Sequence, residues 1–377
     1  MIFLDTASTT PVKEEVIQVI VDVLRNNYGN PSSVYEYGVE SKNIINESIN
    51  TIKRIINADS KDKIIFTSGA CESNSTVIKG FNWNYPIITT KIEHISSLQA
   101  MSDVGYDVDK NIVNVNNLGQ IDLKDLNNKC KYNTLRENFR PVFSFIGANN
   151  EIGTIQPINK IQEIVHRNKG LIHVDATQYI PYEKIDVKNQ NIDIMSFSGQ
   201  KFGAPKGIGV LYIKDGIEII PLICGNQQYG LRGGTENIAY IAGIAKAMEL
   251  INYTKSKDIE YLRDYCWGEL CKIADANNKK FKLNGDPLYR LVNNLNFQVP
   301  CLDSQQIVAI MDLNNICISA GSACNSYEKK PSHVLKAIGL TDEEANQSIR
   351  VTIGDDTTKE EIDEFVKQMN YILKEFC

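Results

Sequence analysis

The segment Ser196-Phe197-Ser198-Gly199-Gln200-Lys201 closes an apolar run that starts at Ile192 and leads into a glycine-rich stretch, residues 203–209. This pattern predicts a buried strand with Lys201 at its end. We expect the lysine to be largely desolvated, and burial lowers a lysine pKa because it disfavours the ammonium form. A lysine of lowered pKa is suited to forming a Schiff base with a carbonyl compound.

A second segment, His173-Val174-Asp175-Ala176-Thr177-Gln178, also ends an apolar run. Its Asp175 would be a buried carboxylate that needs a cationic partner. A Schiff-base lysine and an aspartate paired to a pyridinium nitrogen are what a protein contributes to pyridoxal phosphate chemistry. Together the two segments predict pyridoxal 5'-phosphate as the cofactor, although neither would do so alone.

Composition fits an enzyme of the cytoplasm. The formal net charge of −6 and the lack of a dense Lys/Arg cluster argue against nucleic acid as a partner. The N-terminal residues do not resemble a signal peptide, and no apolar run is long enough to span a membrane. The nine cysteines are odd in number and include no CxxC pair, which favours a reducing compartment. We expect no metal site.

Short apolar segments alternate with amphipathic ones, which predicts an α/β fold with a mainly parallel sheet between helices. We expect strands at 63–67, 86–90, 142–145, 170–175, 193–197 and 207–213, and helices at 158–168 and 236–252. Isoleucines at helical spacing predict a helix that ends near Ile56, capped by Ser32 or Ser33. The last helix should start after Thr358, in a capping box with Glu361.

The sequence pattern changes near residue 250, where charged helices and isolated strands replace the alternation of short apolar and amphipathic segments. We therefore place a large domain at residues 13–249. A smaller α+β domain should comprise residues 250–377 together with residues 1–12, which we expect to pack on the C-terminal part.

Several further segments could carry chemistry, and each also has an ordinary structural interpretation. The turn Gly69-Ala70-Cys71 could be a tight strand-to-helix connection or a phosphate-binding helix N-terminus. The stretch 230–235 could be a flexible loop or a second phosphate contact. His94 could be a surface or core histidine. The stretch 149–153 follows an apolar strand, where polar groups would line the ligand-binding edge of a parallel sheet. Arg350, in an apolar strand, would need a carboxylate from the protein or from a substrate.

Cys324 differs from the other cysteines, most of which should be buried. Small and polar residues surround it in the stretch 319–330. This composition is typical of an exposed, mobile loop in which the thiol is accessible. An accessible thiol in a pyridoxal phosphate enzyme indicates a nucleophile for sulfur transfer.

Taken in order along the chain, these motifs resemble the cysteine desulfurases of the class V aminotransferase family, which have the fold-type I architecture of pyridoxal phosphate enzymes. The resemblance runs nearly from end to end. It is carried by the segments 4–11 (LDTASTTP), 29–33 (GNPSS), 66–70 (FTSGA), 93–94 (EH), 149–153 (NNEIG), 173–178 (HVDATQ), 196–199 (SFSG), Lys201, 321–324 (GSAC) and 348–350 (SIR). The distance from Cys324 to Pro331 resembles the long-loop group, which serves iron–sulfur assembly and tRNA thiolation.

The resemblance implies a catalytic role for four residues. Lys201 forms the Schiff base, and Asp175 holds the pyridinium proton. His94 stacks on the cofactor ring and shuttles protons. Cys324 attacks the sulfur of L-cysteine, so that L-alanine is released and a persulfide remains on the enzyme.

The resemblance also implies the binding residues. Asn150 and Gln178 bond to the phenolic oxygen of the cofactor, and Arg350 binds the substrate carboxylate with help from Asn30. The phosphate contacts fall at Ala70, Cys71, Ser198, Gln200 and Thr235. Thr235 is expected to reach over from the other subunit of a homodimer.

The chain departs from the family pattern at the phosphate site. Cys71 stands where the family usually has Thr, and Gln200 where it usually has His, so a weaker donor and an uncharged group replace the usual ones. The loop 225–230 also differs, and we expect the chain to lack, after Cys377, the C-terminal tail that scaffold partners grip in family members. Two alternatives therefore stay open: another lyase or aminotransferase of this family that does not use Cys324, and a binding protein that has lost the cofactor. The sequence does not name the sulfur acceptor.

Overall fold

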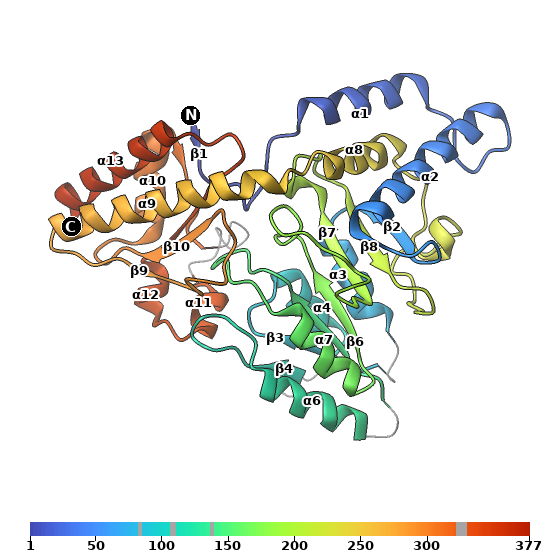
Figure 1. Cartoon of the computed structure of the whole chain (residues 1–377), viewed down its shortest axis with the longest axis horizontal. Coiled ribbons are helices and arrows are strands. Elements are labelled where there is room, and N and C mark those ends of the chain that lie inside the picture. Colours follow the sequence, from blue (N-terminus) through green and yellow to red (C-terminus); the bar gives the residue numbers. More distant parts are fainter. Residues whose placement is uncertain (82–84, 106–110, 136–138, 322–329) are drawn as a thin grey trace.

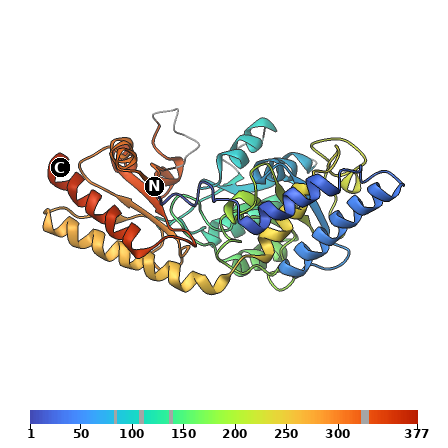
Figure 2. The same cartoon turned by 90° about the horizontal axis from the view of Figure 1, so that it is seen from above.

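The computed structural model describes residues 1–81, 85–105, 111–135, 139–321 and 330–377. Two lobes are visible in Figure 1 and again in the perpendicular view of Figure 2. The larger lobe is built around a sheet of seven strands, and the smaller contains the chain after residue 250 together with the N-terminal strand. The long helix α9 (Ser256–Ala276) runs from the junction along the smaller lobe.

The large sheet has the strand order β2-β8-β7-β6-β5-β3-β4. Only β8 runs against its neighbours β2 and β7, so the carboxyl ends of the other six strands meet at one edge. The strands are β2 (Lys63–Thr67), β3 (Ile87–Thr90), β4 (Ile112–Val113), β5 (Val142–Ile146), β6 (Leu171–Asp175), β7 (Ile194–Ser198) and β8 (Gly209–Ile213).

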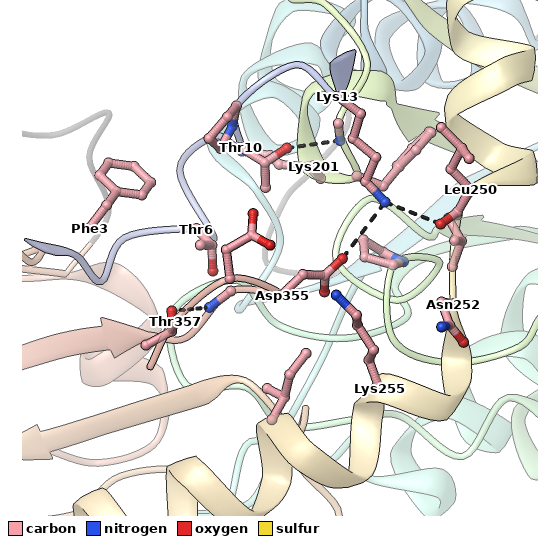
Figure 3. Close-up of a pocket in the computed structure, with 18 of the residues that line it drawn as sticks. Phe3, Thr6, Thr10, Lys13, Lys201, Leu250, Asn252, Lys255, Asp355 and Thr357 are labelled. Atoms are coloured by element: carbon pink, nitrogen blue, oxygen red, sulfur yellow. Dashed lines mark hydrogen bonds and ion pairs between the residues drawn. The ribbon is translucent and has the colours of Figure 1, made fainter. Parts of the chain in front are cut away.

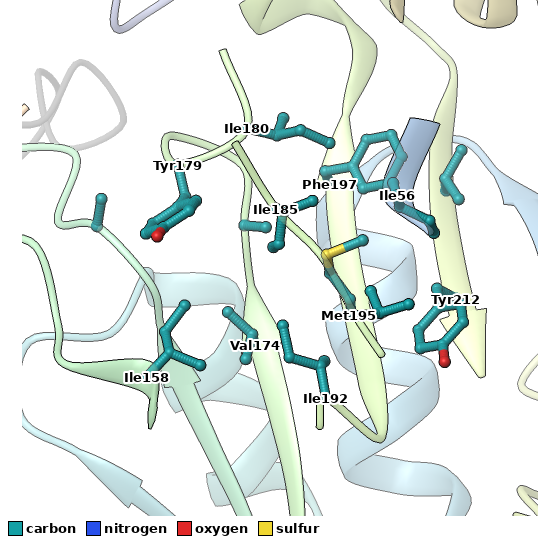
Figure 4. Close-up of a cluster of buried hydrophobic side chains, with 14 of the residues drawn as sticks. Ile56, Ile158, Val174, Tyr179, Ile180, Ile185, Ile192, Met195, Phe197 and Tyr212 are labelled. Atoms are coloured by element: carbon teal, nitrogen blue, oxygen red, sulfur yellow. The ribbon is translucent and has the colours of Figure 1, made fainter. Parts of the chain in front are cut away.

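Helices cover both faces of this sheet, which explains why its central strands are buried along nearly their whole length and are mostly apolar. They are α1 (Glu14–Asn26), α2 (Glu36–Ile56), α3 (Ala70–Gly80), α4 (Ile95–Asp103), α6 (Leu123–Leu135), α7 (Ile158–Arg167) and α8 (Ile238–Glu249). Figure 4 shows part of the main core, in which Met195 and Phe197 of β7 lie near Ile56 of α2 and Ile180. Burial of such side chains contributes about 1.5–3 kcal/mol each.

The smaller lobe has a core of its own, which includes Leu4 from the N-terminal segment. Its elements are β1 (Ile2–Phe3), β9 (Lys282–Leu283), β10 (Asn294–Gln298), β11 (Ile316–Cys317), β12 (Ser348–Thr352), α9, α10 (Ser304–Leu313), α11 (His333–Ala337), α12 (Asp342–Asn346) and α13 (Lys359–Phe376). Strands β12, β10 and β9 form one antiparallel sheet, and β1 pairs in parallel with β11. The N-terminal segment therefore packs in the smaller lobe, together with the C-terminal part of the chain.

The expected α/β fold is confirmed, and the capping box of Thr358 and Glu361 is present at the start of α13. The expected cap of α2 is wrong. This helix starts at Glu36 after Tyr35, whose side chain makes no capping hydrogen bond. Ser32 and Ser33 are instead used in a preceding turn, where the amide of Ser32 donates to Asn30 Oδ1 and that of Ser33 to the Asn30 carbonyl.

One disulfide joins Cys301, before α10, to Cys377 at the C-terminus. The sequence did not indicate it, because 76 positions separate the two cysteines and neither belongs to a recognisable motif. Within the described residues, no helix combines the length and the apolar character needed to cross a membrane.

Candidate active site

The carboxyl edge of the large sheet opens into a cavity of about 300 Å³. Five strands deliver residues to it directly after they end, which is the usual position of a ligand crevice in an open α/β sheet. Arg350 reaches the same cavity from β12 of the smaller lobe, and Ala7 and Ser8 reach it from the N-terminal segment. The residues predicted from sequence that line the cavity are Ala70, Cys71, His94, Asn150, Asp175, Gln178, Ser198, Gln200, Lys201 and Arg350.

Lys201 lies in the short 3-10 turn Gly199–Lys201 that follows β7. Its Nζ donates to the carbonyl of Ala7 at 2.8 Å and to that of Ser8 at 2.5 Å. The residue is half-buried, so the expectation of a largely desolvated lysine was too strong. Two carbonyls of the N-terminal segment hold the amino group at the cavity instead.

Asp175 is the last residue of β6 and is 5% exposed. Its Oδ2 accepts from Nδ2 of Asn74 at 2.7 Å, and its Oδ1 accepts from the amide of Thr177 at 3.0 Å. Both donors stabilise a negative charge on the carboxylate. Sequence reasoning missed Asn74, although a polar residue on the sheet-facing side of α3 is an unusual feature that could have pointed to it.

His94 caps the N-terminus of α4. Its Nδ1 accepts from the amide of Ser96 at 3.2 Å and lies 2.8 Å from Ser96 Oγ. A neutral ring whose Nδ1 accepts this bond carries its proton on Nε2. Burial lowers the pKa of His94, and the charge of Asp175 opposes this effect. The neutral form is therefore favoured at neutral pH.

The turn after β2 places the N-terminus of α3 beside the end of β7. A Cβ on Gly69 would lie 3.4 Å from Ser198 Oγ, and a Cβ on Gly209 of β8 would lie only 2.6 Å from the Cα of Gly69. This close approach requires glycine at position 209. The first turn of α3, with Ala70 and Cys71, and the end of β7 thus face one site, and the N-terminal end of a helix suits an anion.

Arg350 is 2% exposed and has a carboxylate partner within the protein. One terminal nitrogen donates to Asp5 Oδ1 at 2.7 Å, and the other donates to the carbonyl of Asn150 at 2.9 Å. Its Nε is buried and has no hydrogen-bond partner among the described residues. Asp5 was missed as a site residue, because 345 positions separate it from Arg350.

The N-terminal segment is bound from a second direction by Gln178. Its Nε2 donates to the Ala7 carbonyl at 2.8 Å, the same oxygen that accepts from Lys201. The backbone carbonyl of Gln200 accepts from the amide of Thr10 at 2.9 Å. Ala7 and Ser8 therefore form one wall of the cavity, which sequence reasoning did not anticipate.

Three predicted site residues are not brought to this cavity by the described structure. Asn30 is exposed in the loop before α2, where its side chain accepts from Ser32. Thr235 is exposed in the loop before α8 and does not line the cavity. Cys324 lies outside the described residues.

The loop that precedes Thr235 is attached to the large lobe at two points. Gln228 pairs with the backbone of Phe66 on the edge strand β2, accepting at 2.6 Å and donating at 2.9 Å. Arg232 forms an ion pair with Glu72 of α3 at 3.0 Å. Gln227 accepts from the amide of Gly234. The glutamines that replace the usual family pattern therefore make structural contacts within this loop and to β2.

A second, larger cavity of about 580 Å³ lies at the junction of the lobes. Figure 3 shows Lys13 at its centre, bonded to the Leu250 carbonyl at 3.1 Å and paired with Asp355 at 3.7 Å. Lys201 borders both cavities. The aspartates that line the larger cavity, Asp355 and Asp356, are exposed, whereas Asp175 is buried at the smaller one. The smaller cavity is therefore the candidate active site.

Comparison with known proteins identifies the family of the chain. The model of the family Aminotransferase class-V matches residues 2–365. The curated "Cysteine desulfurase IscS" of Dictyoglomus turgidum is 38% identical over 96% of this chain and 91% of its own length. The protein of the same name from Methanosarcina thermophila is 36% identical over 99% and 92%.

The chain belongs to the class V aminotransferase family and, within it, to the cysteine desulfurases.

Solved structures give the same family. The X-ray structure of a NifS-like protein from Rickettsia africae superposes with a TM-score of 0.88 at 29% identity and covers 99% of both chains. A structure described as SspA in complex with cysteine has a TM-score of 0.79 at 30% identity and covers 94% of this chain and 99% of its own. The resemblance drawn from the motifs is thus confirmed at the level of the family and the fold.

Proposed function

We propose that this protein is a pyridoxal phosphate-dependent L-cysteine desulfurase. The observation that carries the proposal is the meeting of Lys201, Asp175 and the N-terminus of α3 at one cavity. An amine, a carboxylate and a phosphate-binding helix end are the donor set that this cofactor requires. Its curated relatives bear the name cysteine desulfurase.

The residues present fit the cofactor. Lys201 would hold it through its amino group, Asp175 would pair with the ring nitrogen, and Asn150 and Gln178 would bond to the phenolic oxygen. Ala70, Cys71, Ser198 and Gln200 would bind the phosphate from this chain. When bound, the cofactor supplies an electron sink for bonds broken next to the substrate nitrogen.

Two residues would act on the substrate from the walls of the cavity. Arg350 would bind the carboxylate of L-cysteine through N–H groups left over from its bonds to Asp5 and Asn150. Asp5 compensates the buried guanidinium and fixes its orientation. His94, neutral and with its proton on Nε2, would hold and move a proton at the cavity. Asn30 would assist Arg350 only if its loop approached from elsewhere in the assembly.

The thiol of Cys324 would take the sulfur. Attack of the thiolate on the substrate sulfur breaks the carbon–sulfur bond, forms a sulfur–sulfur bond on the enzyme and leaves L-alanine as the product. A persulfide retains the sulfur until an acceptor collects it, for iron–sulfur assembly or for tRNA thiolation.

We propose a homodimer, with Thr235 completing the phosphate site of the partner subunit. Thr235 is exposed and lies outside the cavity of its own chain. Exposed apolar side chains occur in the loop before α2, at Tyr28 and Val34, and in the loop that precedes Thr235, at Tyr229. One cavity is lined by Pro31 from the loop before α2 and by Tyr229 from the loop that precedes Thr235, so these two loops lie next to each other. Light scattering should give twice the mass of one chain, and Val34→Glu should lower that mass.

We further propose that residues 13–249 form the large domain, that residues 1–12 and 250–377 form the small one, and that the protein acts in the cytoplasm. Among the described residues, the two largest hydrophobic clusters lie one in each lobe, with Leu291 the one fully buried residue after 250 in the first of them, which supports this division.

The activity is tested by incubating the purified protein with L-cysteine and a thiol and measuring alanine and sulfide. Wild-type protein should form both in equal amounts, and Lys201→Ala should form neither. Retention of the activity by Lys201→Ala, or none in wild-type protein that holds the cofactor, would refute the proposal.

A further inference from the structure

Behind Asp175 lies a continuous row of buried polar side chains that runs under the large sheet's carboxyl edge. It consists of Asn74 from α3, Ser196 from β7, His173 from β6 and Ser144 from β5. All four are at most 2% exposed, and none of them lines the cavity except Asn74. A row of buried polar groups is costly unless each is hydrogen-bonded, so its retention in an apolar sheet calls for an explanation.

The bonds in this row join each member to the next. Asn74 Nδ2 lies 2.7 Å from Asp175 Oδ2, and Asn74 Oδ1 accepts from the Ser196 hydroxyl. Ser196 Oγ is 3.0 Å from His173 Nε2, and His173 Nδ1 is 2.9 Å from Ser144 Oγ. The row therefore spans three neighbouring strands and one helix.

The donor and the acceptor of every bond in the row can be assigned by starting from Asp175. An ionised carboxylate only accepts hydrogen bonds, so the Asn74 amide nitrogen must face Asp175 and its oxygen must face Ser196. The Ser196 hydroxyl then donates to that oxygen and must accept from His173 Nε2–H. This leaves His173 Nδ1 bare, to accept from the Ser144 hydroxyl. All four donors thus point towards Asp175.

We propose that Asn74, Ser196, His173 and Ser144 form a one-way chain of hydrogen-bond donors that positions Asp175 and stabilises its negative charge opposite the cofactor's ring nitrogen. Bonds aligned in this way polarise one another and strengthen the last bond, which is the one to the carboxylate. These are positioning residues, since only Asp175 would touch the cofactor. The inference rests on the proposed function, because it assigns the partner of Asp175.

Neutral histidine is the condition for such a chain, because an imidazolium would donate from both ring nitrogens. Burial lowers the pKa of His173 to about 4, with the charge of Asp175 opposing this effect. The ring should therefore be neutral throughout the physiological range, in agreement with the direction of the bonds.

The first test is the tautomer of His173, measured by long-range ¹H–¹⁵N correlation of ring nitrogens in purified protein between pH 5 and pH 8. The chain has four histidines, and the signal lost in His173→Gln identifies this one. We expect a neutral ring with the proton on Nε2 at every pH in this range. A proton on Nδ1, or titration to the imidazolium within the range, would overturn the proposal.

The second test is the dissociation constant for pyridoxal phosphate, titrated into protein stripped of cofactor. Asn74→Ala and Ser196→Ala should each weaken binding, Asn74→Ala by about 10- to 100-fold, because a bond to a charged group is lost. Ser196→Ala should weaken it less, since Asn74 can still reach Asp175.

Thr154→Val is the matched control. Thr154 is also fully buried, and its hydroxyl likewise makes one donor and one acceptor bond, to the Leu118 carbonyl and from the Asp286 amide, but it does not line the cavity. The substitution Thr154→Val should lower thermal stability as Ser196→Ala does, and it should leave the affinity for pyridoxal phosphate unchanged. Equal affinities for Ser196→Ala and Thr154→Val would show that the row is structural only. Failure of wild-type protein to bind the cofactor at all would instead refute the proposed function, whereas the tautomer of His173 would still report the direction of the chain.

Discussion

At the scale of single residues, two buried groups interact electrostatically with Asp175, and burial shifts their pKa values in opposite directions. Glu93, beside His94, is 1% exposed, and burial raises its pKa to about 8, aided by the charge of Asp175 and opposed by a hydrogen bond from Thr90. His173 has its pKa lowered to about 4 by burial. Both are therefore expected to be neutral near pH 7, so that Asp175 is not faced by a second buried carboxylate charge from Glu93.

Linkage gives the sign of each effect on stability. Between pH 4.5 and about 8 the folded chain holds a proton on Glu93 that the unfolded chain has lost, so this residue makes stability fall as pH rises. His173 acts the other way: the unfolded chain binds the extra proton between about pH 4 and 6.5, so stability falls as pH decreases through that window.

Glu93→Gln removes the first effect and leaves the second. We predict that the free energy of unfolding of the variant, relative to wild type, increases from pH 5 to pH 8 by at most about 4 kcal/mol. Urea denaturation of cofactor-free protein at pH 5, 6.5 and 8 measures this difference. A difference that is the same at all three pH values would mean that Glu93 is ionised in the folded protein.

At the scale of elements, the phosphate site depends on how closely the turn after β2 approaches β8. Gly209→Ala would place a Cβ 2.6 Å from Gly69 Cα and 2.9 Å from the Phe197 carbonyl, so the turn must shift. We predict a loss of stability of about 1–3 kcal/mol and weaker binding of pyridoxal phosphate.

Gly268→Ala is the control for this substitution. Gly268 lies inside α9, and a Cβ there would meet nothing within 4 Å. Alanine should stabilise this helix by about 0.5–1 kcal/mol and leave cofactor binding unchanged. Thermal denaturation and titration with pyridoxal phosphate of both variants measure these effects. Equal cofactor affinity for the two variants would mean that the phosphate site does not depend on the close approach of Gly69 to Gly209.

Sequence reasoning was most successful in locating the strands of the large sheet. Apolar runs bounded by polar or glycine residues located β2, β5, β6, β7 and β8, because strands buried on both faces are continuously apolar. Polar residues immediately after such runs, Lys201 and Asp175 above all, then had to lie at a common edge.

Contacts between distant segments were beyond sequence reasoning. The pairing of Asp5 with Arg350 and that of Asn74 with Asp175 depend on how lobes and layers are stacked, which no local pattern encodes. The predicted cap of α2 failed for a related reason, since the serines before it were used in a turn that packs against Gly38.

At the scale of the whole molecule, the disulfide from Cys301 to Cys377 ties the end of α13 to the loop before α10. It lies in the smaller lobe, and neither cysteine lines the candidate active site. Closing a loop of this length stabilises a protein by roughly 2–4 kcal/mol.

Cys377→Ser should therefore lower the melting temperature under oxidising conditions and have little effect in the presence of a reductant. Its affinity for pyridoxal phosphate should equal that of wild type in both. An unchanged melting temperature under oxidising conditions would mean that the bond contributes nothing to stability in solution.

In the function proposed above, the protein transfers sulfur from L-cysteine to its own Cys324. The most direct measurement is the mass of the peptide containing Cys324 after brief exposure of the protein to L-cysteine. We expect one added sulfur atom on that peptide in wild type and none in Lys201→Ala. Cys324→Ser should still bind the cofactor but form almost no alanine. Alanine production by Cys324→Ser at the wild-type rate, with no added sulfur on the wild-type peptide, would contradict it.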